Sequence, residues 1–186
     1  MSHDNLLVPG EALRLAALGM LEEAPRRYGE LASEIRHLAS RIVGPSLELM
    51  GTSVELLRYE RLVEAGDPAA AAEEADPLLR LTAQGRAALI DLLRAPLKAP
   101  GTQFNRLLLA LKLRFLHHLP PADRAAQLAL IAAWYRSEKD RLAELRDHPA
   151  ARSRLLLAWL DQETAQIDLR LDWLSTAGGE AALEDG

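Results

Sequence analysis

Two long, uninterrupted helical patterns in the second half of the chain, over residues 121–147 and 149–174, constrain its fold most strongly. Pro121 and Pro149 favour these starting points, because proline is tolerated in the first turn of a helix but not in its interior. At 1.5 Å per residue, each helix would be about 39 Å long. A compact unit formed by the second half of the chain cannot cover the apolar faces of helices this long by itself. We therefore expect their apolar faces to pack against a partner chain.

A further helical pattern over residues 102–119 precedes these two, with Thr102 as its expected N-cap. Prolines and glycines at residues 96–101 separate this half from the first. We predict a first domain over residues 1–98, a helical dimerisation domain over residues 99–177 and a disordered acidic tail over residues 178–186. The expected dimer interface consists of apolar side chains on these helices: Phe115, Leu156, Trp159, Leu160, Ile167, Leu171, Trp173 and Leu174.

The first half begins with three shorter helical patterns separated by turns. Apolar residues recur at helical spacing over residues 11–23 and 28–42. Thr52-Ser53-Val54-Glu55 has the spacing of a capping box, which predicts that a third helix begins at Thr52. We expect this helix to end at Gly66, since glycine commonly follows the last turn of a helix.

A short strand and a fourth helix are predicted next. The stretch over residues 67–76 is rich in alanine and acidic residues, and the four residues that begin at Leu78 are apolar and bounded by turns. This second segment predicts a strand over residues 78–81. Thr82 is expected to cap a helix that ends near Arg94. The overall prediction is a mainly α protein with a short β element in its first half.

Composition excludes several classes of protein. The chain has 186 residues, a net charge of −5 and no cysteine, which removes disulfides, thiolate metal sites and cysteine nucleophiles. No apolar run approaches the roughly 20 residues that span a bilayer. The N-terminal segment lacks a basic region ahead of an apolar one, so we expect no signal peptide. We therefore expect a soluble, cytoplasmic protein that has no membrane partner.

Catalytic and metal-binding patterns are not found in the sequence. It shows no glycine-rich phosphate loop, no Ser-His-Asp arrangement and no carboxylate pair in an apolar setting, so we predict neither an enzyme nor a cofactor. His117 and His118 form the one histidine pair, and His3, His37 and His148 are scattered. Adjacent residues on an α-helix point about 100° apart and chelate one ion poorly. We therefore predict no metal site.

Several short motifs, in order along the chain, resemble those of PadR-like transcriptional regulators. The resemblance covers roughly residues 11–175, and it rests on the order of the motifs together with the C-terminal region, since single motifs such as leucine-threonine-x-x-glycine occur in several winged-helix families. The matching segments are Tyr28-Gly29-Glu30-Leu31, Leu62-Val63-Glu64-Ala65-Gly66, Leu81-Thr82-Ala83-Gln84-Gly85-Arg86, Lys112-Leu113-Arg114-Phe115 and Asp172-Trp173-Leu174. The resemblance implies a winged helix-turn-helix domain with a short β wing, followed by long dimerisation helices.

The resemblance also implies a function, that of a homodimeric regulator, most often a repressor, that binds a double-stranded DNA operator. A small effector could bind between the domains, where Trp134 would line its pocket or instead belong to the interface. The residues expected to contact DNA lie at the start of the second helix, in the third helix and beside the wing: Arg26, Arg27, Tyr28, Thr52, Ser53, Arg58, Arg61 and Arg80. The alternative for Arg58 and Arg61 is pairing with Glu55, Glu60 or Glu64 on a solvated helix face.

Two departures from the family pattern support a second hypothesis. Leu56-Leu57 stands where the family usually has a tyrosine-proline pair, and the wing carries Glu73, Glu74 and Asp76 instead of basic residues. Residues 1–100 contain 11 basic and 15 acidic side chains, a net charge of −4. The alternative function is therefore a winged-helix protein-interaction module that has lost DNA binding.

Overall fold

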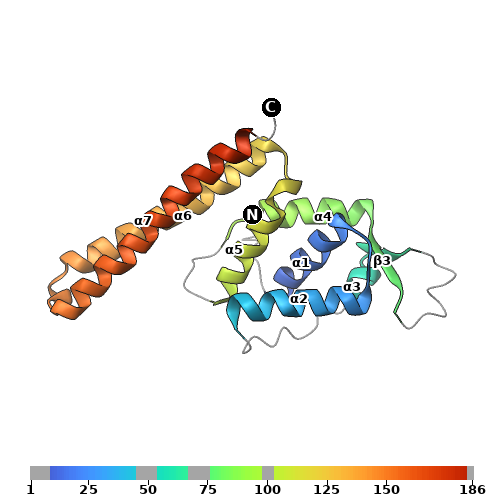
Figure 1. The fold of residues 1–186 in the computed structure, drawn as a ribbon, viewed down its shortest axis with the longest axis horizontal. Helices are drawn as coiled ribbons and strands as arrows, with labels where there is room; N and C mark the ends of the chain where they lie inside the picture. The colour runs from blue at the N-terminus through green and yellow to red at the C-terminus, as the bar shows by residue number, and fades with distance from the viewer. Residues whose placement is uncertain (1–8, 45–53, 67–75, 98–102, 184–186) are drawn as a thin grey trace, which may run out of the picture. The chain divides into compact units, whose positions relative to one another are not determined.

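The computed structural model describes residues 9–44, 54–66, 76–97 and 103–183 (Figure 1). It divides into two compact units, residues 1–119 and 120–186. The first unit contains, in chain order, α1 (Pro9–Glu23), β1 (Arg26–Arg27), α2 (Tyr28–Val43), α3 (Val54–Tyr59), β2 (Val63–Ala65), β3 (Leu78–Leu81), α4 (Ala83–Arg94), α5 (Gln103–Phe115) and the 3₁₀ turn η2 (Leu116–His118).

A small antiparallel sheet in the order β1-β3-β2 joins the helices of the first unit. Arg26 pairs with Leu79, and Val63 pairs with Leu81, so β3 is the central strand. Leu79, a residue of β3, is buried. Three helices, this sheet and α4 together have the arrangement of a winged helix, and the predicted mainly α fold class is confirmed. The predicted strand over residues 78–81 is also confirmed, whereas β1 and β2 were not predicted.

The third helix is shorter than predicted. It ends at Tyr59, not at Gly66, and its predicted start at Thr52 lies outside the described residues. The chain turns at Arg61, which adopts a left-handed φ of 59°, and the Leu62 amide donates to the Leu57 carbonyl over 2.9 Å. Val63 then begins β2. A buried, β-branched residue that can pair with β3 favours a strand over another helical turn.

The fourth helix begins as predicted, with Thr82 as its N-cap. The Thr82 hydroxyl accepts a hydrogen bond from the Gly85 amide at 3.0 Å, and it donates to the Arg61 carbonyl at 2.7 Å. Gly85 packs against the Leu62 carbonyl, and a Cβ at this position would lie 2.0 Å from that oxygen. Glycine is therefore required where α4 approaches the turn that precedes β2.

The second unit is an antiparallel pair of long helices, α6 (Pro121–Asp147) and α7 (Arg154–Leu183), joined by the 3₁₀ turn η3 (Pro149–Ala151) (Figure 1). Ion pairs connect Lys139 to Asp168 and Arg146 to Asp161, so the register runs antiparallel. The buried side chains of α7 recur every seven residues and pack with those of α6: Leu160, Ile167 and Leu174 with Leu128, Ile131, Tyr135 and Leu142.

The second half differs from the sequence-based expectation at three points. The last α-helix begins at Arg154, not at Pro149, because Pro149 instead begins the 3₁₀ turn η3, with His148 as its N-cap. Helix α7 continues to Leu183, past residue 177, where we expected the helical domain to end, and the disorder of the tail stays a prediction. The two units also divide after Leu119, not after residue 98, since α5 packs on α1 and α2.

Lys112 on α5 is fully buried and connects that helix to the end of α4. Its ammonium group donates hydrogen bonds to the carbonyls of Leu93 at 2.6 Å and Ala95 at 2.5 Å. These carbonyls lie at the C-terminal end of α4, where a positive charge is favourable. Burial nevertheless lowers the pKa of Lys112 to about 8.

We predict that Lys112 makes the stability of the fold depend on pH in the alkaline range. Between about pH 8 and pH 10.5 the unfolded chain retains this proton and the folded chain does not. The free energy of unfolding should therefore rise with pH across this interval, by as much as about 3 kcal/mol. Urea denaturation at a series of pH values from 7 to 10.5 measures this free energy of unfolding. A Lys112→Met variant should lack this rise, and an equal rise in the variant would contradict the assignment.

Candidate nucleic-acid interface

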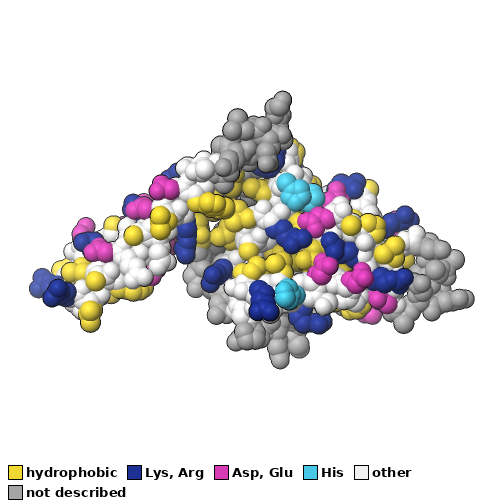
Figure 2. Space-filling model, in the orientation of Figure 1, with side chains coloured by type: hydrophobic (Ala, Val, Ile, Leu, Met, Phe, Trp, Pro, Cys, Tyr) yellow, Lys and Arg dark blue, Asp and Glu magenta, His cyan; other side chains and the backbone are white. Residues whose placement is uncertain are grey.

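Charged side chains of both signs are interspersed over the first unit. Figure 2 shows basic and acidic groups side by side on the face in view, with no continuous basic patch. Cations that are paired within the protein are less available to DNA phosphates. The pairing of each predicted contact residue therefore matters more than the net charge.

The N-terminus of α2, which we expected to meet a phosphate, is already occupied by carboxylates. Glu30 accepts a hydrogen bond from the Arg27 amide at 3.3 Å, and Asp76 accepts one from the Gly29 amide at 2.8 Å. Asp76 precedes β3, so the sheet brings it to the helix from 47 residues away. Acidic groups at this end stabilise the helix dipole. A DNA phosphate would have to displace them.

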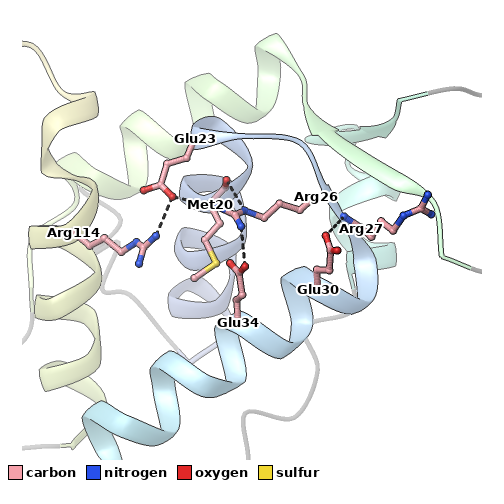
Figure 3. A network of polar contacts seen from close by, with 7 residues as sticks. All are labelled: Met20, Glu23, Arg26, Arg27, Glu30, Glu34 and Arg114. Carbon is pink, nitrogen blue, oxygen red and sulfur yellow. Dashed lines mark hydrogen bonds and ion pairs between the residues drawn. The ribbon is translucent and has the colours of Figure 1, made fainter.

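Arg26 serves the fold of the first unit (Figure 3). Its guanidinium donates to the Met20 carbonyl of α1 at 3.3 Å and to Glu34 of α2 at 2.9 Å, and lies 3.7 Å from Glu23. Glu23 in turn pairs with Arg114 of α5 at 2.9 Å. The side chain of Arg26 is partly buried within this network. Its predicted role as a DNA contact therefore competes with a structural one.

The next two residues, Arg27 and Tyr28, are both exposed. The Arg27 guanidinium donates to the Asp76 carbonyl at 2.7 Å, and in Figure 3 it points away from the network around Arg26. Arg80 also has a partner, because it lies across from Glu64 on β2 and its Nε is 3.1 Å from that carboxylate. Thr52, Ser53, Glu73 and Glu74 lie outside the described residues.

Arg58 and Arg61 differ from these paired cations. Both are exposed, and within the described part of the chain neither guanidinium takes part in an ion pair. Two of the three carboxylates that we considered as partners are engaged elsewhere, since Glu60 pairs with Arg14 of α1 at 2.5 Å and Glu64 with Arg80. The structure therefore does not show the alternative in which Arg58 and Arg61 are neutralised on their own helix.

Tyr59 is a candidate that the sequence analysis missed. It lies between the two arginines at the end of α3, and 86% of its side chain is exposed. Leu57 on the same short helix is buried and anchors it to the core. An exposed tyrosine next to free cations is a good donor to phosphate oxygens. Its exposure was not predictable, because the sequence suggested a longer helix.

The predicted dimer residues fall into three groups. Leu160, Ile167 and Leu174 are buried against α6, and Phe115 is buried in the first unit against Gly19, so a single chain already covers these four. Leu156 and Leu171 are partly buried. Trp159 and Trp173 are 49% and 53% exposed, and they share one side of α7 with two further exposed residues, Leu155 and Leu169.

A family model described as "Putative AphA-like transcriptional regulator" matches residues 2–177. The chain belongs to this family. The match supports the predicted class, a transcriptional regulator, whereas the more specific PadR-like assignment is not confirmed. Among proteins with curated descriptions, none matches the chain. No helix in the described ranges is long and apolar enough to cross a membrane.

The contrast between Arg26 and Arg58 in this regulator is testable through stability. Arg26→Gln should lower the free energy of unfolding by about 1–2 kcal/mol, because it removes charged hydrogen bonds to two helices. Arg58→Gln should change it by less than about 0.5 kcal/mol, as expected for an exposed residue without partners. Urea denaturation at neutral pH compares the two variants. Equal losses would contradict the structural role given to Arg26.

Proposed function

We propose that this transcriptional regulator binds double-stranded DNA through α3 and the turn that follows it. The observation that carries the proposal is the exposure, without an ion pair in the described structure, of Arg58 on the third helix of a winged helix and of Arg61 in the turn after that helix. Helix-turn-helix proteins insert this helix into the major groove. Arginine is the side chain that most often reads guanine there, through two parallel hydrogen bonds.

The residues of this surface would make different contacts with DNA. Arg58 and Arg61 would read base edges or hold phosphates, and Tyr59 would donate to a phosphate oxygen. The start of α2 contributes less, because Glu30 and Asp76 occupy its amide donors. The acidic residues of the wing, including Asp76, and the net charge of −4 over residues 1–100 support the alternative of a protein-interaction module. That function remains the second candidate, and DNA binding is the test that separates the two.

We further propose that the regulator is a homodimer that uses one side of α7. The exposed residues Leu155, Trp159, Leu169 and Trp173 form an apolar stripe, which we call the α7 stripe. Exposed tryptophans on a long helix are typical anchors of protein interfaces. A two-fold dimer would bury the stripe of each chain and present two recognition helices to a palindromic operator. Repression, with release by a small effector, is the mode of action that we propose for this dimer.

Substitution of the two free arginines tests the DNA-binding surface. In Arg58→Ala and Arg61→Ala, operator affinity should fall by about 1–3 kcal/mol for each contact that reads a base. Arg80→Ala is the matched control, because Arg80 is paired with Glu64, and its effect should be smaller. Fluorescence anisotropy with a labelled operator at fixed salt measures all three variants. Unchanged affinity in both the Arg58 and the Arg61 variant would remove this surface from the interface.

Charge placed on the α7 stripe tests the dimer. Trp159→Asp and Trp173→Asp together should produce a folded monomer, since neither side chain belongs to the buried core of the hairpin. Ser175→Asp is the control, because this exposed residue lies on the opposite side of α7. Light scattering gives the mass, and circular dichroism checks the fold. A double variant that remains dimeric would refute the stripe as the interface.

A further inference from the structure

Three metal-ligating side chains meet at the end of α1. Glu23 is the last residue of that helix, and His117 and His118 form the end of the turn η2. One ligand atom from each residue lies within 4.8 Å of the others. All three belong to the first unit, and Glu23 is 94 residues from His117 and 95 from His118 in sequence. The fold thus adds a carboxylate to the histidine pair, which the sequence alone could not reveal.

The local backbone differs from the one assumed in the sequence analysis. Helix α5 ends at Phe115, so both histidines lie in a 3₁₀ turn and not inside an α-helix. Their rings are tilted by 44° with centroids 4.0 Å apart. The two imidazoles therefore point to a common region, and the objection that adjacent helical residues diverge does not apply.

Each imidazole has a feature that suits a metal ligand. The Nδ1 atom of His117 lies 3.0 Å from the Arg114 carbonyl, and a donor at that position leaves the lone pair on Nε2, as is usual for a metal-bound histidine. The Nε2 atom of His118 is buried and has no hydrogen-bond partner in the described part of the chain.

Arginines compete for the carboxylate. Arg114 and Arg26 approach the same oxygen of Glu23, Oε2, at 2.9 Å and 3.7 Å, and Glu22 is held by Arg86. A metal ion would share or replace these cations at Glu23. The competition limits affinity, and it also predicts that removal of Arg114 strengthens metal binding.

We propose that Glu23, His117 and His118 bind a zinc ion. Two imidazoles and one carboxylate form a ligand set that zinc takes in proteins, at about 2.0–2.2 Å, with a fourth position for water. The ligand atoms must approach each other to about 3.3 Å for tetrahedral geometry, which side-chain rotation can supply because Glu23 and His117 are exposed. The bound ion would connect the end of α1, which leads into β1 and α2, to the turn after α5.

Calorimetric titration of zinc ions alone into the metal-stripped full-length protein tests the site. We expect one ion per chain, with affinity at least about tenfold weaker in His117→Ala and in Glu23→Gln. His37→Ala is the matched control, since this exposed histidine lies on α2, away from the three ligands, and its affinity should equal that of the wild type. Cobalt(II) absorption of the same proteins reports the ligand geometry.

If a ligand variant unfolds, a variant that is expected to bind zinc more tightly than the wild type still tests the proposal. Arg114→Gln leaves all three ligands and removes the cation nearest to Glu23, so zinc should bind more tightly than to the wild type. Absence of saturable zinc binding by the wild type overturns the proposal. So does an affinity that falls as much in His37→Ala as in His117→Ala. None of these outcomes depends on DNA, so the metal site and the proposed function fail or hold separately.

Discussion

The first unit depends on one guanidinium group, that of Arg26. Its backbone pairs with β3, and its side chain reaches the end of α1 and the middle of α2 (Figure 3). Through Glu23 the same network extends to α5. A cation held by partners on several elements fixes their relative positions, because each partner loses a charged hydrogen bond if an element moves. It also makes Arg26 less available at the surface, whereas Arg58 on α3 and Arg61 in the turn that follows are exposed without an ion pair among the described residues.

Local patterns were sufficient to predict some of the elements. The limits of α6 and β3, and the role of Thr82 as a cap, follow from helical periodicity, a bounded apolar run and a hydroxyl before a helix. The strands β1 and β2 have two and three residues, too few to show any period, and they exist because β3 lies beside them. The left-handed turn at Arg61 was not predicted, because no glycine occupies that position.

The site was only partly predictable, because exposure and pairing are properties of the fold. Arg26, Arg58 and Arg80 look equivalent in sequence, yet only Arg58 lacks an ion pair among the described residues. Glu60, a neighbour that could have neutralised Arg58, instead pairs with Arg14 from 46 residues away. Likewise, the adjacent Trp159 and Leu160 both fit an apolar face, but α6 covers only the leucine. Contacts between residues this far apart in sequence produce no recognisable pattern in the local sequence.

The account rests on specific DNA binding by the winged-helix unit, and selection from genomic DNA tests it most directly. Purified full-length protein would capture fragments of the native genome at about 150 mM salt, a fixed value because such binding weakens steeply with salt. The captured fragments would then be sequenced. The account predicts enrichment of one palindromic site in a promoter region. A folded dimer that enriches no sequence would contradict it and favour the protein-interaction module.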